Sequence, residues 1–217
     1  MNIFRIATRI ATGHIPGKPW LKVFDFDETL VSTGAQPWAV NPNAPSDFLK
    51  SDGSDVSDSQ LDGWYSDNVQ HRIDDGDYSK IPKGWSPEFR EFKNMMVEPV
   101  VHNQEMFDEM IKMVNSGRGD VVVITARSQP KGIEKILSDY GINVDVYSLG
   151  ADGSKAIAEG KAYYIESLME DKGYRNIHFF DDSVRNIDAI KALSVKWNSQ
   201  HPDDPAYFST KLVKMSK

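Results

Sequence analysis

The sequence predicts an α/β protein, a Rossmann-like parallel sheet with helices on both faces. Apolar runs of strand length alternate with segments of helical periodicity, and most of the connections between them are short. The run over residues 121–124 is β-branched without polar alternation, which is typical of a strand buried on both faces of a parallel sheet. With 217 residues, of which 40% are hydrophobic, the chain suits a single domain that carries an insertion.

The first half of the chain contains two expected strands and two expected helices. An apolar run over 21–24 predicts a strand that stops at two aspartates. After the insertion, periodicity returns with a helix over 88–97 and a clearer helix over 103–116, whose apolar residues fall on one face. Gly117 ends that helix, and the strand over 120–124 follows.

The second half repeats the alternation of helix and strand. Glycine ends the first of these helices, and apolar residues three or four apart define the last one. The expected elements are a helix over 129–140, a strand over 144–149, a helix over 160–172, a strand over 176–180, a helix containing Ile187, Ile190 and Leu193, and edge strands at Trp197 and over 207–213.

Residues 32–98 interrupt this alternation and are predicted to form an acidic insertion or small cap. Between residues 35 and 78 there are nine aspartates against one lysine and one arginine. The aspartates do not follow the order of a calcium-binding loop, so a solvated acidic loop is the favoured interpretation. Aromatic residues such as Trp64 and Tyr65 stand among them, which a pure linker would lack. We expect the insertion to set substrate choice, with these two rings as the contacts; the alternative is that the rings only anchor the insertion to the sheet domain.

Polar side chains follow three of the expected strands, at the point where each strand ends. They are Asp25 and Asp27, Thr125 and Arg127, and Asp181 and Asp182. The carboxyl ends of parallel strands share one edge of a sheet, where ligands bind, so these side chains are expected to lie together. Several carboxylates repel one another unless a cation is present, and oxygen ligands of this kind suit Mg²⁺. A hydroxyl, a backbone amide and a lysine would complete a pocket for a phosphoryl group, which makes phosphoryl transfer to a carboxylate the expected reaction class.

Over about residues 20–195, outside the insertion, the chain resembles the haloacid dehalogenase-like superfamily. The resemblance rests on four motifs in order: Asp25-Phe26-Asp27-Glu28-Thr29, Ile124-Thr125-Ala126-Arg127, a lysine, and Phe179-Phe180-Asp181-Asp182. It implies a magnesium-dependent phosphomonoester hydrolase that works through an aspartyl-phosphate. The expected substrate is a small-molecule phosphomonoester such as a nucleotide, or the terminal phosphate of a nucleic acid.

The same resemblance implies a role for each matching residue. Asp25 would be the nucleophile, and Asp27 the acid that protonates the leaving group and then the base that activates water. The metal ligands would be the Asp25 carboxylate, the Asp27 backbone carbonyl and Asp182, with Asp181 in support. The phosphate would be held by Thr125, Ala126, Arg127 and Lys161.

The identity of the lysine is open at the level of sequence. Lys161 opens the expected helix over 160–172 and suits the family by its spacing to Asp182, whereas Lys155 follows Gly153-Ser154 and is the alternative. Arg127 resembles an arginine of polynucleotide phosphatase and RNA-repair-type members, and Gly63-Trp64-Tyr65 is faintly similar to the same group.

Three other functions compete with this interpretation. A phosphate-sensing receiver domain uses similar residues, but there the lysine comes last. A P-loop kinase is suggested by residues 150–155, although their spacing departs from the phosphate-loop pattern. The third is a non-catalytic phosphate- or metal-binding module on the same fold, which the complete set of chemical positions makes less favoured.

Composition narrows the possible partners and compartments. The net charge of −7 argues against broad binding to nucleic-acid backbones. The chain has no cysteine, which excludes disulfides and thiolate chemistry and favours a reducing, cytoplasmic location. No apolar stretch approaches the length of a membrane span, and no obligate protein partner is evident. The first 20 residues are basic, but a packed N-terminal arm is favoured over a targeting segment.

Overall fold

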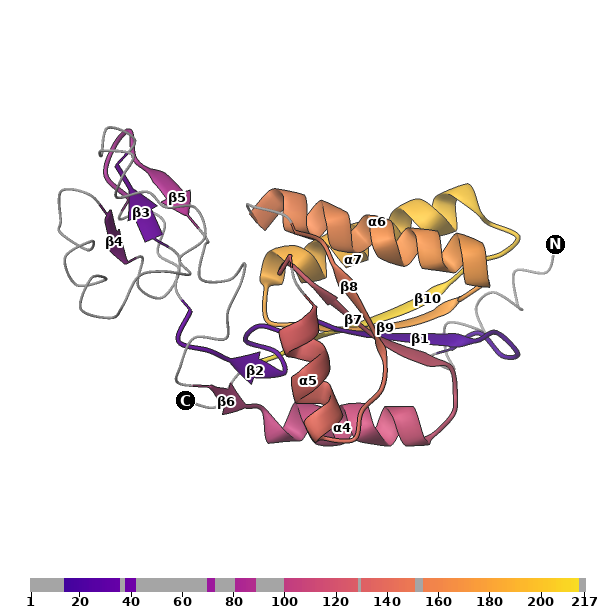
Figure 1. The fold of residues 1–217 in the computed structure, drawn as a ribbon. Helices are drawn as coiled ribbons and strands as arrows, with labels where there is room; N and C mark the ends of the chain where they lie inside the picture. The colour runs from indigo at the N-terminus through magenta and orange to yellow at the C-terminus, as the bar shows by residue number, and fades with distance from the viewer. Residues whose placement is uncertain are drawn as a thin grey trace. The chain divides into compact units, whose positions relative to one another are not determined.

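The computed structural model describes residues 14–35, 38–41, 70–72, 81–88, 100–128, 130–150 and 154–214. The chain divides into two compact units (Figure 1). One comprises Met1–Ser32 with Val101–Lys217, and the other comprises Thr33–Val100.

The first unit is built on a five-stranded sheet with the order β10-β9-β1-β7-β8. Its strands are β1 (Trp20–Phe24), β7 (Asp120–Thr125), β8 (Asp145–Ser148), β9 (Asn176–Asp181) and β10 (Tyr207–Leu212). Each neighbouring pair is parallel, and Val23 in the central strand lies opposite Val122 on one side and Phe179 on the other. The prediction of a parallel α/β sheet is therefore confirmed.

In the described part of the chain, four helices cover the two faces of this sheet. They are α4 (Gln104–Asn115), α5 (Lys131–Asp139), α6 (Ser154–Lys172) and α7 (Val184–Gln200). Figure 1 shows α4 and α5 on one face and α6 and α7 on the other. Right-handed crossovers account for this division, because the chain moves outward from β1 to β8 in one direction and from β9 to β10 in the other. The strand order therefore reverses between β1 and β9, the position at which open α/β sheets bind ligands.

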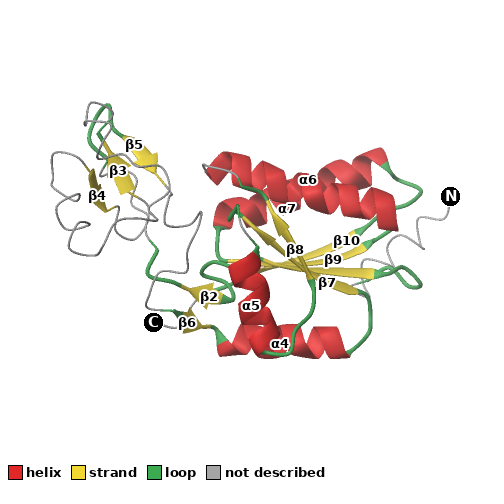
Figure 2. Ribbon diagram, viewed as in Figure 1, coloured by secondary structure: helices red, strands yellow, loops and turns green. Residues whose placement is uncertain are grey.

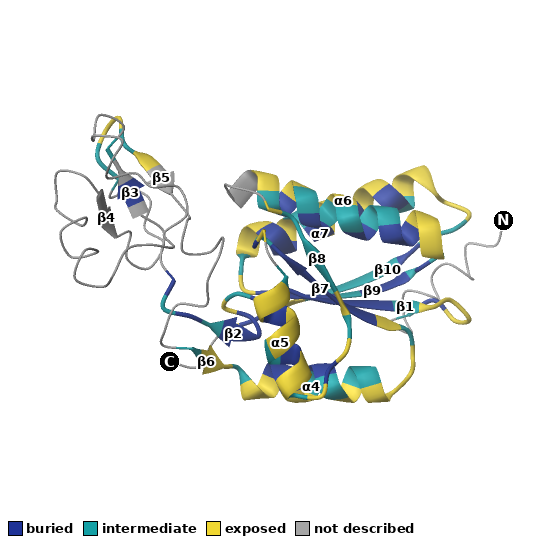
Figure 3. Ribbon diagram, viewed as in Figure 1, coloured by how far each residue is buried: buried dark blue, intermediate teal, exposed yellow. Residues whose placement is uncertain are grey.

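Alternate residues of each strand face opposite layers of the fold. Leu21 and Val23 belong to the core between the sheet and the pair α6 and α7, whereas Phe24 stacks on Phe180 with ring centroids 4.5 Å apart. Most residues of β1 and β9 are therefore buried, as the burial colours show (Figure 3). Among the described helices, none combines the length and apolar composition that a membrane crossing needs.

The second unit contains a small antiparallel sheet of order β4-β3-β5 (Figure 2), made of β3 (Trp38–Val40), β4 (Gln70–Arg72) and β5 (Ser86–Glu88). The expected helix over 88–97 lies outside the described residues, except that Glu88 ends β5. The rings of Trp64 and Tyr65, most of the aspartate-rich stretch and the centre of the suggested phosphate loop, residues 151–153, also lie outside the described residues.

The chain leaves the first unit and returns to it through two short paired strands. These are β2 (Val31–Ser32) and β6 (Val101–His102), which run antiparallel with Ser32 opposite Val101. They bracket the insertion expected over 32–98.

Two expectations about the helices are wrong. α6 begins at Ser154, so Lys161 lies in the second turn rather than at the start. Gly160, the expected start of the helix, is an interior residue of α6, and a Cβ there would approach Leu149 Cδ1 at 3.2 Å. Trp197 is a buried residue of α7 and not an edge strand. It favours strands by type, but it lies two helical turns after Ile190 on the same buried face.

We expect Gly119→Ala to be much more damaging than Gly117→Ala. Gly119 has φ of 105°, and a Cβ at this position would lie 2.3 Å from the backbone oxygen of Trp20. Gly117 also has positive φ, at 60°, but its Cβ would meet nothing within 4 Å. The loss of unfolding free energy should be about 1 kcal/mol for Gly117→Ala and at least about 3 kcal/mol for Gly119→Ala, measured by urea denaturation. Equal losses would contradict this account of the turn before β7.

Candidate active site

The site lies where β1 and β9 end, at the point where the strand order reverses. Asp25 directly follows β1, and its backbone N–H donates to the Phe180 carbonyl at 2.9 Å. Asp181 is the last residue of β9. Both side chains are almost fully buried, with 8% of the Asp25 side chain and none of the Asp181 side chain exposed. The sheet itself therefore fixes two carboxylates side by side.

Lys161 joins these two carboxylates from α6. Its Nζ donates to Asp25 Oδ1 at 2.6 Å and to Asp181 Oδ2 at 2.7 Å, and only 1% of its side chain is exposed. Burial by itself lowers the pKa of Lys161, but the charges of Asp25 and Asp181 outweigh it and raise the pKa, so the ammonium stays charged. The structure thus brings Lys161 to the site, whereas the side chain of Lys155 lies outside the described residues.

Both carboxylate oxygens of Asp181 accept hydrogen bonds from more than one donor. Besides Lys161, the Ser183 backbone N–H donates to Oδ1 at 2.9 Å, and Asn186 Nδ2 donates to Oδ1 at 2.9 Å and Oδ2 at 3.1 Å. Its two oxygens therefore have little capacity left for a metal ion, which suits a supporting role. Asn186 was not among the expected site residues. The signal for it is its place in the first turn of α7, three residues after the N-cap Ser183.

Three carboxylates gather here, from Asp25, Asp181 and Asp182, with one oxygen of each within 4.8 Å of the others. Burial, and then the charges of Asp181, Asp182 and Asp27, raise the pKa of Asp25 well above its usual range against the opposing effect of Lys161. Removal from water and the charge of Asp181 raise the pKa of Asp182 to about 7. One lysine does not balance three carboxylates, and an all-oxygen donor set of this kind fits a hard divalent cation such as Mg²⁺.

A tight reversal follows β1 and separates Asp25 from Asp27. The Phe26 carbonyl accepts from the backbone N–H groups of Leu30 at 2.9 Å and Val31 at 3.0 Å, and Glu28 has φ of 55°. The strand geometry that would place both aspartates on one face of the sheet is therefore lost, and each carboxylate finds its own partner.

Hydrogen bonds of Asn103 link this reversal to α4. Its backbone N–H donates to the Leu30 carbonyl at 2.8 Å, and its Nδ2 donates to the Thr29 carbonyl at 3.1 Å. The Asn103 side chain is also the N-cap of α4 and accepts from the Met106 backbone N–H. The Thr29 hydroxyl lies 3.4 Å from Asp25 Oδ2, so one connected network supports the first aspartate.

Asp27 is paired with Arg127 from the end of β7. Arg127 Nε donates to both carboxylate oxygens of Asp27 at 3.0 Å, and Nη2 donates to Oδ1 at 2.6 Å. The buried Thr125 hydroxyl accepts from the Arg127 backbone N–H at 3.2 Å, and Ala126 is half-buried between them. Direct contacts thus group the expected residues into two sets, Asp25 with Lys161 and Asp181, and Asp27 with Arg127.

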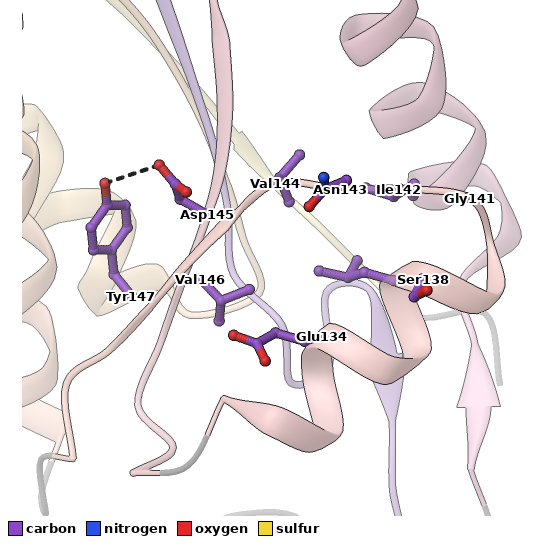
Figure 4. A pocket seen from close by; sticks show the side chains of 10 residues that line it. Glu134, Ser138, Gly141, Ile142, Asn143, Val144, Asp145, Val146 and Tyr147 are labelled. Atoms are coloured by element: carbon purple, nitrogen blue, oxygen red, sulfur yellow. Dashed lines mark hydrogen bonds between the residues drawn. The ribbon is translucent and has the colours of Figure 1, made fainter.

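A separate pocket of about 870 Å³ lies at the outer edge of the sheet, between α5 and β8 (Figure 4). Glu134 and Ser138 line it from α5, and Asp145 and Tyr147 line it from β8. Its described lining residues include two acids and no lysine or arginine, so this part of the lining does not suit an anionic substrate. The carboxylate site remains the candidate for chemistry.

Neither a protein-family model nor a curated protein matches this chain. The family resemblance of its motifs therefore stays a prediction from the sequence.

Proposed function

We propose that this protein is a magnesium-dependent phosphomonoesterase that works through an aspartyl-phosphate on Asp25. The observation that carries the proposal is the lysine bridge from Lys161 to Asp25 and Asp181, with Asp182 in the same cluster. In this cluster, the lysine offsets the negative charge of the buried carboxylate, so that an anionic phosphoryl group can approach it. Isolated acidic residues on a surface lack such a cation.

The reaction then has two balanced steps. An Asp25 oxygen attacks phosphorus while the ester P–O bond breaks, and the leaving alkoxide takes a proton from Asp27. In the second step Asp27 removes a proton from water, whose oxygen attacks phosphorus and breaks the bond to Asp25. The products are the alcohol and inorganic phosphate, and both aspartates return to their starting states.

Other residues of the chain bind and orient the phosphoryl group. The charged Lys161 beside Asp25 Oδ1 favours the approach of an anion to a carboxylate that would otherwise repel it. Thr125 and the backbone of Ala126 contribute donors at the end of β7. A magnesium ion, held by Asp25 and Asp182 with the Asp27 carbonyl, would neutralise charge on the phosphoryl oxygens.

The proposed substrate class rests on the resemblance of Arg127 to the arginine of polynucleotide phosphatase members. We propose a nucleotide or the terminal phosphate of a nucleic acid, and a panel of phosphomonoesters assayed with magnesium tests this directly. Phosphate release from none of them, together with magnesium binding, would favour the non-catalytic binding module instead.

Activity is expected to depend on magnesium and on Asp182. Excess chelator should abolish phosphate release, and Asp182→Ala should raise the magnesium concentration for half-maximal rate at least about tenfold, because a charged ligand is lost. Asp188→Ala is the matched control, since Asp188 is an exposed acid that pairs with Lys191 on the next turn of α7. Full activity in chelator would exclude the metal, and an unchanged requirement in Asp182→Ala would remove this residue from its ligands.

A further inference from the structure

The geometry of the ion pair between Arg127 and Asp27 indicates what the arginine does for this carboxylate. Only 3% of the Arg127 side chain and 20% of the Asp27 side chain are exposed. Nε spans both carboxylate oxygens, and Nη2 adds a second hydrogen bond to Oδ1. A planar guanidinium bound in this way fixes both the position and the plane of the carboxylate, which a single point charge could not do.

The backbone holds the arginine in place for this contact. The Arg127 N–H donates to Thr125 Oγ1, which turns the chain directly after β7. Because β7 is the neighbour of β1 in the sheet, this turn lies beside the reversal that carries Asp27, although the two residues are 100 positions apart. The position of this ion pair is therefore fixed by the two neighbouring strands, β1 and β7, whose carboxyl ends carry its members.

We infer that Arg127 is a positioning residue for Asp27, and that it is not the principal binder of the substrate phosphate. The inference rests on the proposed function, in which Asp27 gives a proton to the leaving group. Oδ1 accepts two hydrogen bonds from the guanidinium and Oδ2 accepts one, so Oδ2 is the oxygen with capacity left to carry that proton. Among the hydrogen bonds of the described residues, Arg127 thus leaves Oδ2 as the oxygen that would carry the proton.

The two roles of Arg127 differ in what its loss does to different substrates. A phosphate binder contacts the same group in every substrate, so its removal weakens binding and slows all of them alike. A residue that positions the acid matters only where the leaving group needs a proton. Alkyl phosphates have strongly basic leaving groups, whereas p-nitrophenolate departs without protonation.

The test compares Arg127→Gln and Arg127→Lys with the wild type on an alkyl phosphate and on p-nitrophenyl phosphate. Single-turnover release of the alcohol or phenol isolates the first step. For Arg127→Gln we expect a fall of roughly 100-fold or more with the alkyl phosphate. The fall with p-nitrophenyl phosphate, and the change in inhibition by inorganic phosphate, should stay within about threefold. Arg127→Lys keeps the positive charge but not the planar guanidinium, and it should show the same selective loss.

Arg175→Gln is the control for a general effect of losing a partly buried arginine. Arg175 pairs with Asp204 and precedes β9, at the amino ends of the strands. The Arg175→Gln variant should leave the ratio of the rate with the alkyl phosphate to the rate with p-nitrophenyl phosphate unchanged. Equal loss on both substrates, with weaker inhibition by phosphate, would overturn the positioning role while leaving the proposed function intact. Wild-type protein that hydrolyses neither substrate would refute both. Thermal unfolding of each variant separates these results from loss of fold.

Discussion

Asp25→Asn is expected to lower turnover by roughly 10⁴- to 10⁶-fold, the range found when a nucleophile or its base is removed. The amide keeps the shape of the side chain and one oxygen near Lys161, but it has no anionic oxygen to attack phosphorus. The remaining phosphate-binding groups, including Lys161 and Thr125, would still bind substrate.

The same substitution should leave the fold intact and, in metal-free buffer at neutral pH, at least as stable as the wild type. Burial raises the pKa of Asp25 in the folded protein, so the folded state holds this proton to higher pH than the unfolded state. Stability from this group is thus present at low pH and is lost as the pH rises through the folded-state pKa. The neutral amide does not incur that loss.

Phosphate release and urea denaturation of the same preparations check both parts of this prediction, with Asp188→Asn as the exposed control. Turnover within tenfold of the wild type would rule out attack by Asp25. An inactive variant that is also much less stable would show that the carboxylate supports the fold rather than the chemistry.

Lys161→Met should have the largest effect on stability, a loss of about 3–5 kcal/mol in unfolding free energy without metal. Methionine fills a similar volume but leaves Asp25 and Asp181 buried without their shared cation. Two unpaired carboxylates at this distance repel each other and have no water to solvate them. Activity should be lost as well, because the approach of an anionic substrate is no longer favoured.

Urea denaturation in chelator and in excess magnesium measures this effect. Part of the loss should return with magnesium, and part should return in the double variant Lys161→Met/Asp181→Asn. Lys196→Met is the control, since Lys196 pairs with Glu166 while 52% of its side chain is exposed, and its loss should be below about 1 kcal/mol. A similar small loss for Lys161→Met would contradict the dependence of the two carboxylates on this lysine.

The parts of the fold that could be predicted are those set by local pattern. A β-branched run without polar residues, such as 121–124, must be buried on both faces, and this locates β7 and the parallel sheet. The starting point of α6 could not be found in this way. Glycine is a weak helix former and indicates a helix boundary by type, yet Gly160 lies inside α6, close to Leu149.

Most members of the candidate site were predictable, but Asn186 and the pairings were not. Lys161 could have been separated from Lys155 by helical phase, because Ala158, Lys161, Ile165 and Leu168 form one buried stripe of α6. A lysine inside such a stripe requires a buried partner. The ion pair between Arg127 and Asp27 joins residues that are 100 positions apart. No local sequence pattern predicts which acceptor a guanidinium will bind.

The pairing of β2 with β6 has a consequence for how this protein could diversify. Ser32 and Val101 face each other across one antiparallel ladder, so the intervening chain leaves and rejoins the first unit at two paired positions. The length and sequence between those ends can therefore change without shifting the register of any strand in the five-stranded sheet. Selection for a new substrate could act on that segment while the residues around Asp25 stay the same.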